Sequence, residues 1–270
     1  MTLQSLTIYP VKSCGALDLL ESEVEARGLR YDRRWMIVDE SGRFLSQREV
    51  PGLATIRPQL TPSELVLHCG DARLDLPLHL ENGHTMPVQI WHDEVEAVRV
   101  GELADDWLRD ILGLDVRLVW MPDDAKRPVD ANYAHDGEIT SFSDGFPFLI
   151  LSQSSVDDLN DRILSRGEDA IEANRFRSNF LVAGAQPYDE DSWAHFRIGD
   201  CEFEVVKPCS RCSIPTIDQS TGQRTGAEPL RTLATYRKQG NQTFLAQNAL
   251  PRKLGRVRVG DEIEVLSRQT

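Results

Sequence analysis

Two cysteines, Cys209 and Cys212, are the residues of this sequence whose type and spacing point most directly to chemistry. They lie in the run KPCSRC, where Lys207 and Arg211 are close neighbours. A nearby cation favours the thiolate, which is the form of cysteine that attacks electrophiles and binds metals. The run therefore predicts a reactive or metal-binding thiol, although the spacing alone is also compatible with two inert thiols.

Other chemistries for these thiols fit the sequence less well. A structural zinc site needs four cysteine or histidine ligands, usually from two close pairs, and the adjacent residues His68 and Cys69 do not form a second pair of this kind. A thioredoxin-like redox pair stands at the start of a helix, whereas Pro215 and turn-forming residues follow here. His135 and His195 have no nucleophile beside them, so a serine hydrolase has no local support.

Three groups of basic residues lie where predicted strands begin or end. Each group alone is typical of a solvated loop. Because the chain is acidic, with 43 acidic against 30 basic residues, their recurrence at strand ends predicts one anion-binding cleft. A turn within residues 140–147 could add polar contacts from Ser143, Asp144 and Gly145, although such a sequence is also typical of an ordinary turn. The basic groups are Lys12 with Ser13; Arg30, Arg33 and Arg34; and Arg175 with Arg177.

Composition and charge restrict the classes of partner. A net charge of -13 gives no general source for the phosphate neutralisation that drives nucleic-acid binding. The N-terminus lacks the pattern of a signal peptide, and the longest apolar run, residues 146–151, is too short to span a bilayer. Five cysteines, an odd number, indicate reduced thiols. We therefore expect a cytoplasmic protein that binds neither membranes nor nucleic acid.

Short strands separated by turns dominate the first hundred residues. The runs are LTIY, RWMIVDE, RFLSQ, ELVLHC, RLDLPL and VEAVRV, and their close spacing predicts a small β-barrel or sandwich-like domain. Apolar residues then recur at helical spacing over residues 102–112, and Gly113 follows as a helix-ending residue. Residues 121–138 have no periodicity, so we expect two domains, residues 1–121 and 122–270.

The second half mixes strands with a few helices. A helix is predicted from Ser155 to Ile163, with Ser155 and Asp158 as a capping box, and a short helix has Pro229 in its first position. Strands are expected at FPFLILS and FLVAG, and hairpins at HFRIGDCEFEVV and VRVGDEIEVL. The fold class is therefore mainly β with some α, an N-terminal β-barrel-like domain followed by a second β-barrel domain with a few helices.

Eight ordered segments together resemble the MOSC family. They are YPVKSC, LRYDRRWMIVDE, DGFPFLILSQSSVDDLN, NRFRSNFLVAG, YDEDSW, IGDCEFEVVKPCSRC, TIDQSTG and VGDEIEVL, and they run nearly from end to end. The similarity is to the branch that joins an N-terminal MOSC β-barrel domain to the MOSC domain, as in amidoxime-reducing components and N-hydroxylaminopurine resistance proteins. Members of this branch bind the molybdenum cofactor, a molybdopterin with molybdenum.

The resemblance implies roles for individual residues. It implies that Cys212 ligates molybdenum as the catalytic residue and that Ser210 touches the cofactor. It also implies that Lys12 and Ser13 hold the phosphate end of the pterin. Arg33 and Arg177 would pair with phosphate or pterin oxygens, and the turn formed by Ser143, Asp144 and Gly145 would add a further contact. The chemistry agrees, because the cofactor needs cations for its phosphate and one soft ligand for its metal.

The resemblance further implies a two-electron reduction of a small N-hydroxylated substrate, such as an amidoxime, a hydroxylamine or an N-hydroxylated base. Asp218 and Asn248 could shape the substrate entrance. No four-cysteine pattern for an iron–sulfur cluster is present, so electrons would come from a separate ferredoxin, flavodoxin or cytochrome b5 type of donor with its reductase. Two alternatives stay open: a carrier of the cofactor or of sulfur, and a β-barrel interaction module with inert thiols.

Overall fold

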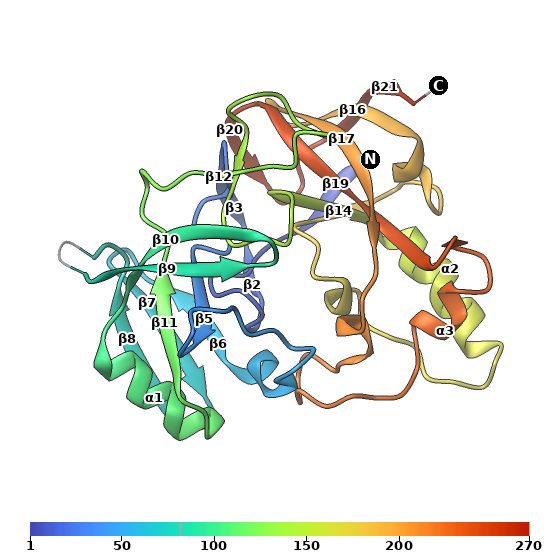
Figure 1. Cartoon of the computed structure of the whole chain (residues 1–270). Helices are drawn as coiled ribbons and strands as arrows, with labels where there is room; N and C mark the ends of the chain where they lie inside the picture. The colour runs from blue at the N-terminus through green and yellow to red at the C-terminus, as the bar shows by residue number, and fades with distance from the viewer. Residues whose placement is uncertain (81–82, 270) are drawn as a thin grey trace.

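Strands are the main regular structure of the computed structural model, which describes residues 1–80 and 83–269 (Figure 1). The described residues form five sheets, and the prediction of a mainly β fold with some α is confirmed. No helix of these residues combines the length and apolar character needed to cross a membrane.

Two small sheets and one helix build the N-terminal part. A four-stranded sheet has the order β5-β11-β10-β9 and a three-stranded sheet the order β6-β7-β8. The strands are β5 (Trp35–Asp39), β6 (Arg57–Leu60), β7 (Glu64–Cys69), β8 (Ala72–Pro77), β9 (Thr85–Ile90), β10 (Asp93–Arg99) and β11 (Val116–Trp120). Trp35, Leu67 and Leu118 are buried together in the core between them, because strand alternation turns such side chains inward.

Helix α1 (Glu102–Leu112) packs its apolar side on this core through Ala104 and Leu108. It follows the predicted bounds, 102–112. Gly113 ends it in a left-handed conformation, with φ of 67°, which glycine adopts without the steric strain of a side chain. The predicted helix and its terminating glycine are therefore confirmed.

The largest sheet has nine strands and belongs mainly to the C-terminal part. Its path is β2-β1-β15-β14-β19-β17-β16-β21, with β18 paired to β19. Four phenylalanines, Phe148, Phe180, Phe196 and Phe203, form its aromatic core with neighbouring ring centroids 5.1–5.5 Å apart. The bounds are β1 (Thr2–Ile8), β2 (Leu17–Leu19), β14 (Phe148–Ser152), β15 (Phe180–Ala183), β16 (Trp193–Ile198), β17 (Cys201–Ser210), β18 (Lys238–Gln239), β19 (Gln242–Lys253) and β21 (Ile263–Arg268).

The first residues of the chain pair with the last ones. Strand β1 lies antiparallel to β15, and β3 (Glu21–Glu25) lies between β4 (Gly28–Leu29) and β20 (Gly255–Arg258). Residues 1–29 therefore complete sheets of the C-terminal part (Figure 1). The division of the chain at residue 121 remains a prediction. Of residues 121–138, only β12 (Arg127–Pro128) forms a strand, paired with β13 (Ile139–Thr140).

Three local predictions were wrong. Helix α2 (Gln153–Leu164) begins earlier than expected, because its N-cap is Ser152 rather than Ser155, and the Ser152 hydroxyl accepts a hydrogen bond from the Ser155 amide. The segment VRVGDEIEVL is no hairpin, because β20 pairs with β3 and β21 with β16. The run RFLSQ makes only isolated bridges at its first two residues.

The hairpin of β16 and β17 is confirmed. Helix α3 (Leu230–Leu233) forms with Pro229 as its N-cap, one position before the expected one. The remaining short helices are η1 (Pro51–Thr55), η2 (Ala173–Phe176), η3 (Asp189–Ser192) and η4 (Ile214–Thr216).

Candidate functional site

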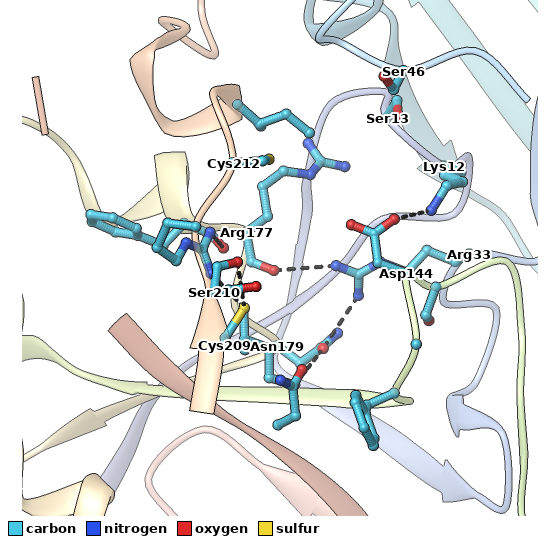
Figure 2. Close-up of a pocket in the computed structure, with 18 of the residues that line it drawn as sticks. Lys12, Ser13, Arg33, Ser46, Asp144, Arg177, Asn179, Cys209, Ser210 and Cys212 are labelled. Atoms are coloured by element: carbon cyan, nitrogen blue, oxygen red, sulfur yellow. Dashed lines mark hydrogen bonds and ion pairs between the residues drawn. The ribbon is translucent and has the colours of Figure 1, made fainter. Parts of the chain in front are cut away.

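One cleft collects loops from distant parts of the chain (Figure 2). The loops follow β1, precede β5, β14 and β15, and continue from the end of β17. The cleft is partly open to solvent. All the residues predicted to bind the cofactor line it: Lys12, Ser13, Arg33, Ser143, Asp144, Gly145, Arg177, Ser210 and Cys212.

A lysine and an aspartate form an ion pair at one side of the cleft. The Lys12 ammonium lies 2.5 Å from the Asp144 carboxylate, and the lysine side chain is 7% exposed while the aspartate is 62% exposed. Burial lowers the pKa of Lys12 to about 8, against the attraction of Asp144. Partial loss of solvent alone would raise the pKa of Asp144, but the nearby Lys12 holds it well below its usual range. Both groups are charged at neutral pH.

Two arginines share one aromatic ring beneath the cleft. The guanidinium carbons of Arg33 and Arg177 lie 4.5 and 4.1 Å from the ring centroid of buried Tyr9. The Arg33 guanidinium donates to the carbonyl of Arg177 at 3.2 Å, and that of Arg177 donates to the carbonyl of Cys14 at 2.8 Å. Burial lowers the pKa of Arg177 to about 10, which leaves it protonated at neutral pH. The ring and the carbonyls fix both cations in place.

A buried carboxylate and amide support Arg33 from behind. The Asp32 carboxylate accepts from the Arg33 guanidinium at 2.5 Å and from the Asn179 amide at 3.1 Å. The Asn179 side-chain oxygen accepts in turn from Arg33 and from the Leu149 amide. These contacts join two loops of the cleft and strand β14, and Figure 2 shows Asn179 beside Arg33. Each buried polar group of this network has a partner, so the network is rigid.

The cleft backbone adopts a conformation that side chains disfavour. Ser13, Arg33 and Arg177 have φ of 68°, 50° and 56°. Residues other than glycine are uncommon in this left-handed region, and such strain concentrates at functional sites. At Arg33 and Arg177 the Tyr9 ring and backbone carbonyls hold the side chains at the cleft.

The two thiols of the cleft have different surroundings. Cys209 lies on β17, packs against the apolar cluster that contains Leu151 and Phe176, and accepts a hydrogen bond from Arg211 at 3.0 Å. Burial raises its pKa, although Arg211 opposes the shift. Cys212 follows the end of β17 in the loop and also lines the cleft. Cys209 is therefore the thiol that packs into the protein, and Cys212 is the one carried by a loop.

One buried hydroxyl in the cleft lacks a partner. The side-chain oxygen of Ser143 is buried without a hydrogen bond to any described residue, although a buried polar group normally has one. Its loop is held from below by Arg127, which donates to the carbonyls of Ser141 and Ser143 and pairs with Asp93. The hydroxyl is thus a free polar group in a fixed loop, available to a bound ligand.

Two family profiles match the chain. The MOSC N-terminal beta barrel domain matches residues 1–115, and the MOSC domain matches residues 137–264. This chain belongs to the MOSC family. The chain is also 33% identical to mitochondrial amidoxime-reducing component 1 of Mus musculus, over 98% of this chain and 82% of the relative.

A second relative is matched over a smaller share of its own length, and one solved structure aligns with this chain. Molybdenum cofactor sulfurase of Danio rerio is 33% identical over 90% of this MOSC chain, which spans 31% of that relative. Among solved structures, the YuaD protein of Bacillus subtilis aligns with 99% of this chain and 96% of its own, at 12% identity and a TM-score of 0.42.

Not all the basic residues singled out in the sequence reach the cleft of this MOSC protein. Arg30 pairs with Glu23, and Arg34 binds the carbonyl of Met121 and the carboxylate of Asp123. Arg30 is exposed at the surface, and Arg34 is buried. The expectation that the basic groups line one cleft therefore holds for Lys12, Arg33 and Arg177, while Arg30, Arg34 and Arg175 lie outside it.

The two residues expected at a substrate entrance, Asp218 and Asn248, differ in their position relative to the cleft. Asn248 lines the cleft. Asp218 does not, because its carboxylate accepts from the amides of Ser220 and Thr221 and so closes its own turn. The hydrogen bond from the Ser220 hydroxyl, followed by that from the Thr221 amide, lowers the pKa of Asp218 to about 2. The place of Asp218 at a substrate entrance remains a prediction.

Sequence reasoning missed several lining residues, among them Ser46, Arg48, Asn179 and Arg211. Asn179 and Arg211 lie inside the runs NRFRSN and KPCSRC, whereas Arg48 follows RFLSQ, which was predicted to be a strand.

Within residues 1–80 and 83–269, no three His, Cys, Asp or Glu side chains are grouped so that they could hold a metal.

Proposed function

We propose that this MOSC protein is a molybdenum-cofactor-dependent reductase of small N-hydroxylated compounds, with Cys212 as the protein's metal ligand. The observation that carries the proposal is the convergence of Lys12, Arg33 and Arg177 with the Cys212 thiol in one cleft. The similarity to an amidoxime-reducing component over 98% of the chain supports the same reaction class.

The residues of the cleft fit the cofactor. Its phosphate needs cations in fixed positions, and Arg33 and Arg177 are held by Tyr9 and by backbone carbonyls. Its pterin ring needs hydrogen-bonding groups, and Ser143 offers a hydroxyl without a partner. Its metal needs a soft ligand, and a thiolate is one. Lys12, Ser13, Ser210 and the turn of Asp144 and Gly145 would complete the contacts.

When bound, the cofactor supplies the two-electron redox chemistry, and the protein binds, orients and tunes it. The balance is one N-hydroxy group, two electrons and two protons giving the N–H product and one water. Lys12 is mostly protonated at pH 7, since its pKa of about 8 lies above that pH, and it can therefore balance the charge of a phosphate. We propose that a separate ferredoxin, flavodoxin or cytochrome b5 type of protein supplies the electrons, and that the protein works in the cytoplasm.

The test compares three proteins made in a host that synthesises the cofactor: wild type, Cys212→Ser and Cys209→Ser. Molybdenum content, pterin fluorescence after oxidation, and reduction of benzamidoxime with reduced methyl viologen are measured on each. We expect near-stoichiometric metal and pterin and measurable turnover in wild type. Cys212→Ser loses turnover, whereas Cys209→Ser keeps most of it. Equal loss in both variants would contradict a single metal ligand.

A cofactor or sulfur carrier is the second candidate, favoured by the 33% identity to a molybdenum cofactor sulfurase. The same preparations separate the two. A protein that holds metal and pterin but reduces none of a panel of amidoximes and hydroxylamines with the artificial donor would be a carrier. A protein free of both groups, although the host pathway is intact, would contradict both candidates.

A further inference from the structure

A second depression opens beside the cleft and shares two lining residues with it, Ser46 and Arg48. Its other walls include the rings of Phe44 and Trp91. The turn that carries Trp91 joins β9 to β10, and Figure 1 shows this hairpin reaching toward the C-terminal sheet. The depression is therefore an extension of the cleft, formed by the N-terminal part alone.

Trp91 occupies a position that its residue type disfavours. It has φ of 58° in the turn between two antiparallel strands, where asparagine and glycine are the usual residues. The indole is nevertheless 39% exposed. A bulky residue that keeps a strained backbone and is still partly exposed is an outlier, and such outliers point to function.

The contacts of Trp91 connect the depression to the cleft. Its ring centroid lies 5.1 Å from that of Phe44, and its indole nitrogen donates to the Asp144 carboxylate at 3.2 Å. Asp144 is the partner of Lys12. A ligand bound against the Trp91 ring would therefore lie next to the Lys12–Asp144 pair at the side of the cleft.

Arg48 is a cation of this depression without a carboxylate partner among the described residues. Its guanidinium carbon lies 4.4 Å from the Trp91 ring centroid, and its Nε donates to the Ser46 hydroxyl at 3.3 Å. Arg43, in the same depression, differs, because it pairs with Asp39 and Glu49. Arg48 thus offers the remaining donors of its guanidinium to an anion.

We propose that this depression, lined by Phe44, Arg48 and Trp91, is a binding subsite for the non-reacting end of the substrate. The aromatic faces favour a planar ring, and Arg48 favours an anionic group on that ring, a carboxylate in particular. The inference rests on the proposed function, since the reacting N-hydroxy group would lie in the cleft. It adds the substrate class: planar aromatic N-hydroxylated acids.

The test uses two probes that differ in one charge, benzamidoxime and 4-carboxybenzamidoxime. Dissociation constants are measured by calorimetry on the protein as purified, without turnover, and kcat and KM are measured with an artificial donor. We expect the carboxylated probe to bind about tenfold more tightly to wild type, as one charge-assisted contact at a half-exposed site allows. Arg48→Gln removes this preference, so the two probes bind with similar affinity.

Matched variants separate the subsite from general effects. Arg43→Gln removes a cation that is already paired and keeps the preference. Trp91→Asn replaces the indole with a residue that suits the left-handed turn, so the protein stays folded, while both probes bind more weakly and KM rises more than kcat falls. Loss of the preference in Arg43→Gln as well would overturn the proposal. It would mean that the preference comes from the overall electrostatic potential of the surface and not from a contact with Arg48.

Two other outcomes decide between this inference and the proposed function. A lower pterin content in Arg48→Gln, with the charge preference unchanged, would make Arg48 a cofactor contact and overturn the subsite. Reduction of both probes by wild type with equal kcat/KM and equal affinity would overturn the subsite and leave the reductase standing. A charge preference in binding without any pterin or turnover would support the subsite and reject the reductase.

Discussion

Replacing Lys12 with methionine should stabilise the folded protein at neutral pH while weakening anion binding in the cleft. The Lys12 side chain is 7% exposed, and burial lowers its pKa from 10.5 to about 8. One pKa unit corresponds to about 1.4 kcal/mol, so folding disfavours the ammonium form by about 3 kcal/mol at pH 7. Methionine has a similar shape and no charge. Asp144 loses its partner, but it is 62% exposed and water can hydrate it.

The stability difference between wild type and Lys12→Met should depend on pH. Between pH 8 and 10.5 the folded protein has released the Lys12 proton while the unfolded chain retains it, so wild type gains stability from this group as pH rises. The advantage of Lys12→Met should therefore fall from about 3 kcal/mol at pH 7 to about 1.4 kcal/mol at pH 9.5. Other titrating groups cancel, because they are common to both proteins.

The assay is denaturant unfolding of wild type and Lys12→Met at pH 7 and 9.5, with pterin-free protein. Lys126→Met, at an exposed lysine, is the control and should change stability by less than about 0.5 kcal/mol. A variant less stable than wild type, by the same amount at both pH values, would refute the reasoning. It would mean that the Lys12–Asp144 attraction outweighs the desolvation of the lysine.

Three further substitutions test the supports of the site. Tyr9→Leu should lower pterin content and phosphate affinity roughly five- to thirtyfold, because the ring contacts both cleft guanidiniums, whereas Tyr9→Phe, which keeps the ring, should stay near wild type. Ser152→Ala should lower the free energy of unfolding by about 1–3 kcal/mol, since the hydroxyl caps α2 and donates to a buried glutamate; Ser154→Ala, two residues further on at a partly exposed position, should lower it less. Gly222→Ala should be more destabilising than Gly70→Ala in thermal unfolding: both glycines have positive φ, but only at Gly222 would the new carbon lie 3.0 Å from a carbonyl oxygen. Equal losses in the members of any pair would contradict the contact invoked for it.

Local signals predicted local structure well. Helix α1 was placed correctly because its apolar spacing and its terminating Gly113 are both readable within a dozen residues. The hairpin expected around Gly260 failed because the strands on either side pair with β3 and β16, which lie far away in sequence. A turn sequence indicates where the chain bends, and it does not indicate which strand each arm will pair with.

The candidate site, too, could be predicted only in part from the sequence. The cleft-lining cations were visible in the sequence, but the basic cluster alone does not separate Arg33, which reaches the cleft, from Arg34, which binds the carbonyl of Met121. Only the resemblance to the MOSC family singled out Arg33. The difference follows from the left-handed backbone at Arg33. Arg48 and Trp91 could not be found in advance, because each is a single residue brought to the cleft by folding of the N-terminal sheets.

The pairing of the first strands with the last ones has a consequence for synthesis on the ribosome. Strand β1 carries the buried residues Leu3, Leu6 and Ile8. One of its two partners, β15, begins at residue 180, and one of the two partners of β3, β20, begins at residue 255. At roughly 5–20 residues per second, these two strands wait for about ten to fifty seconds before their distant partners emerge. During that time they are exposed strand edges, which aggregate readily. Chaperone supply during translation should therefore limit the soluble yield of this protein more than the stability of its finished fold.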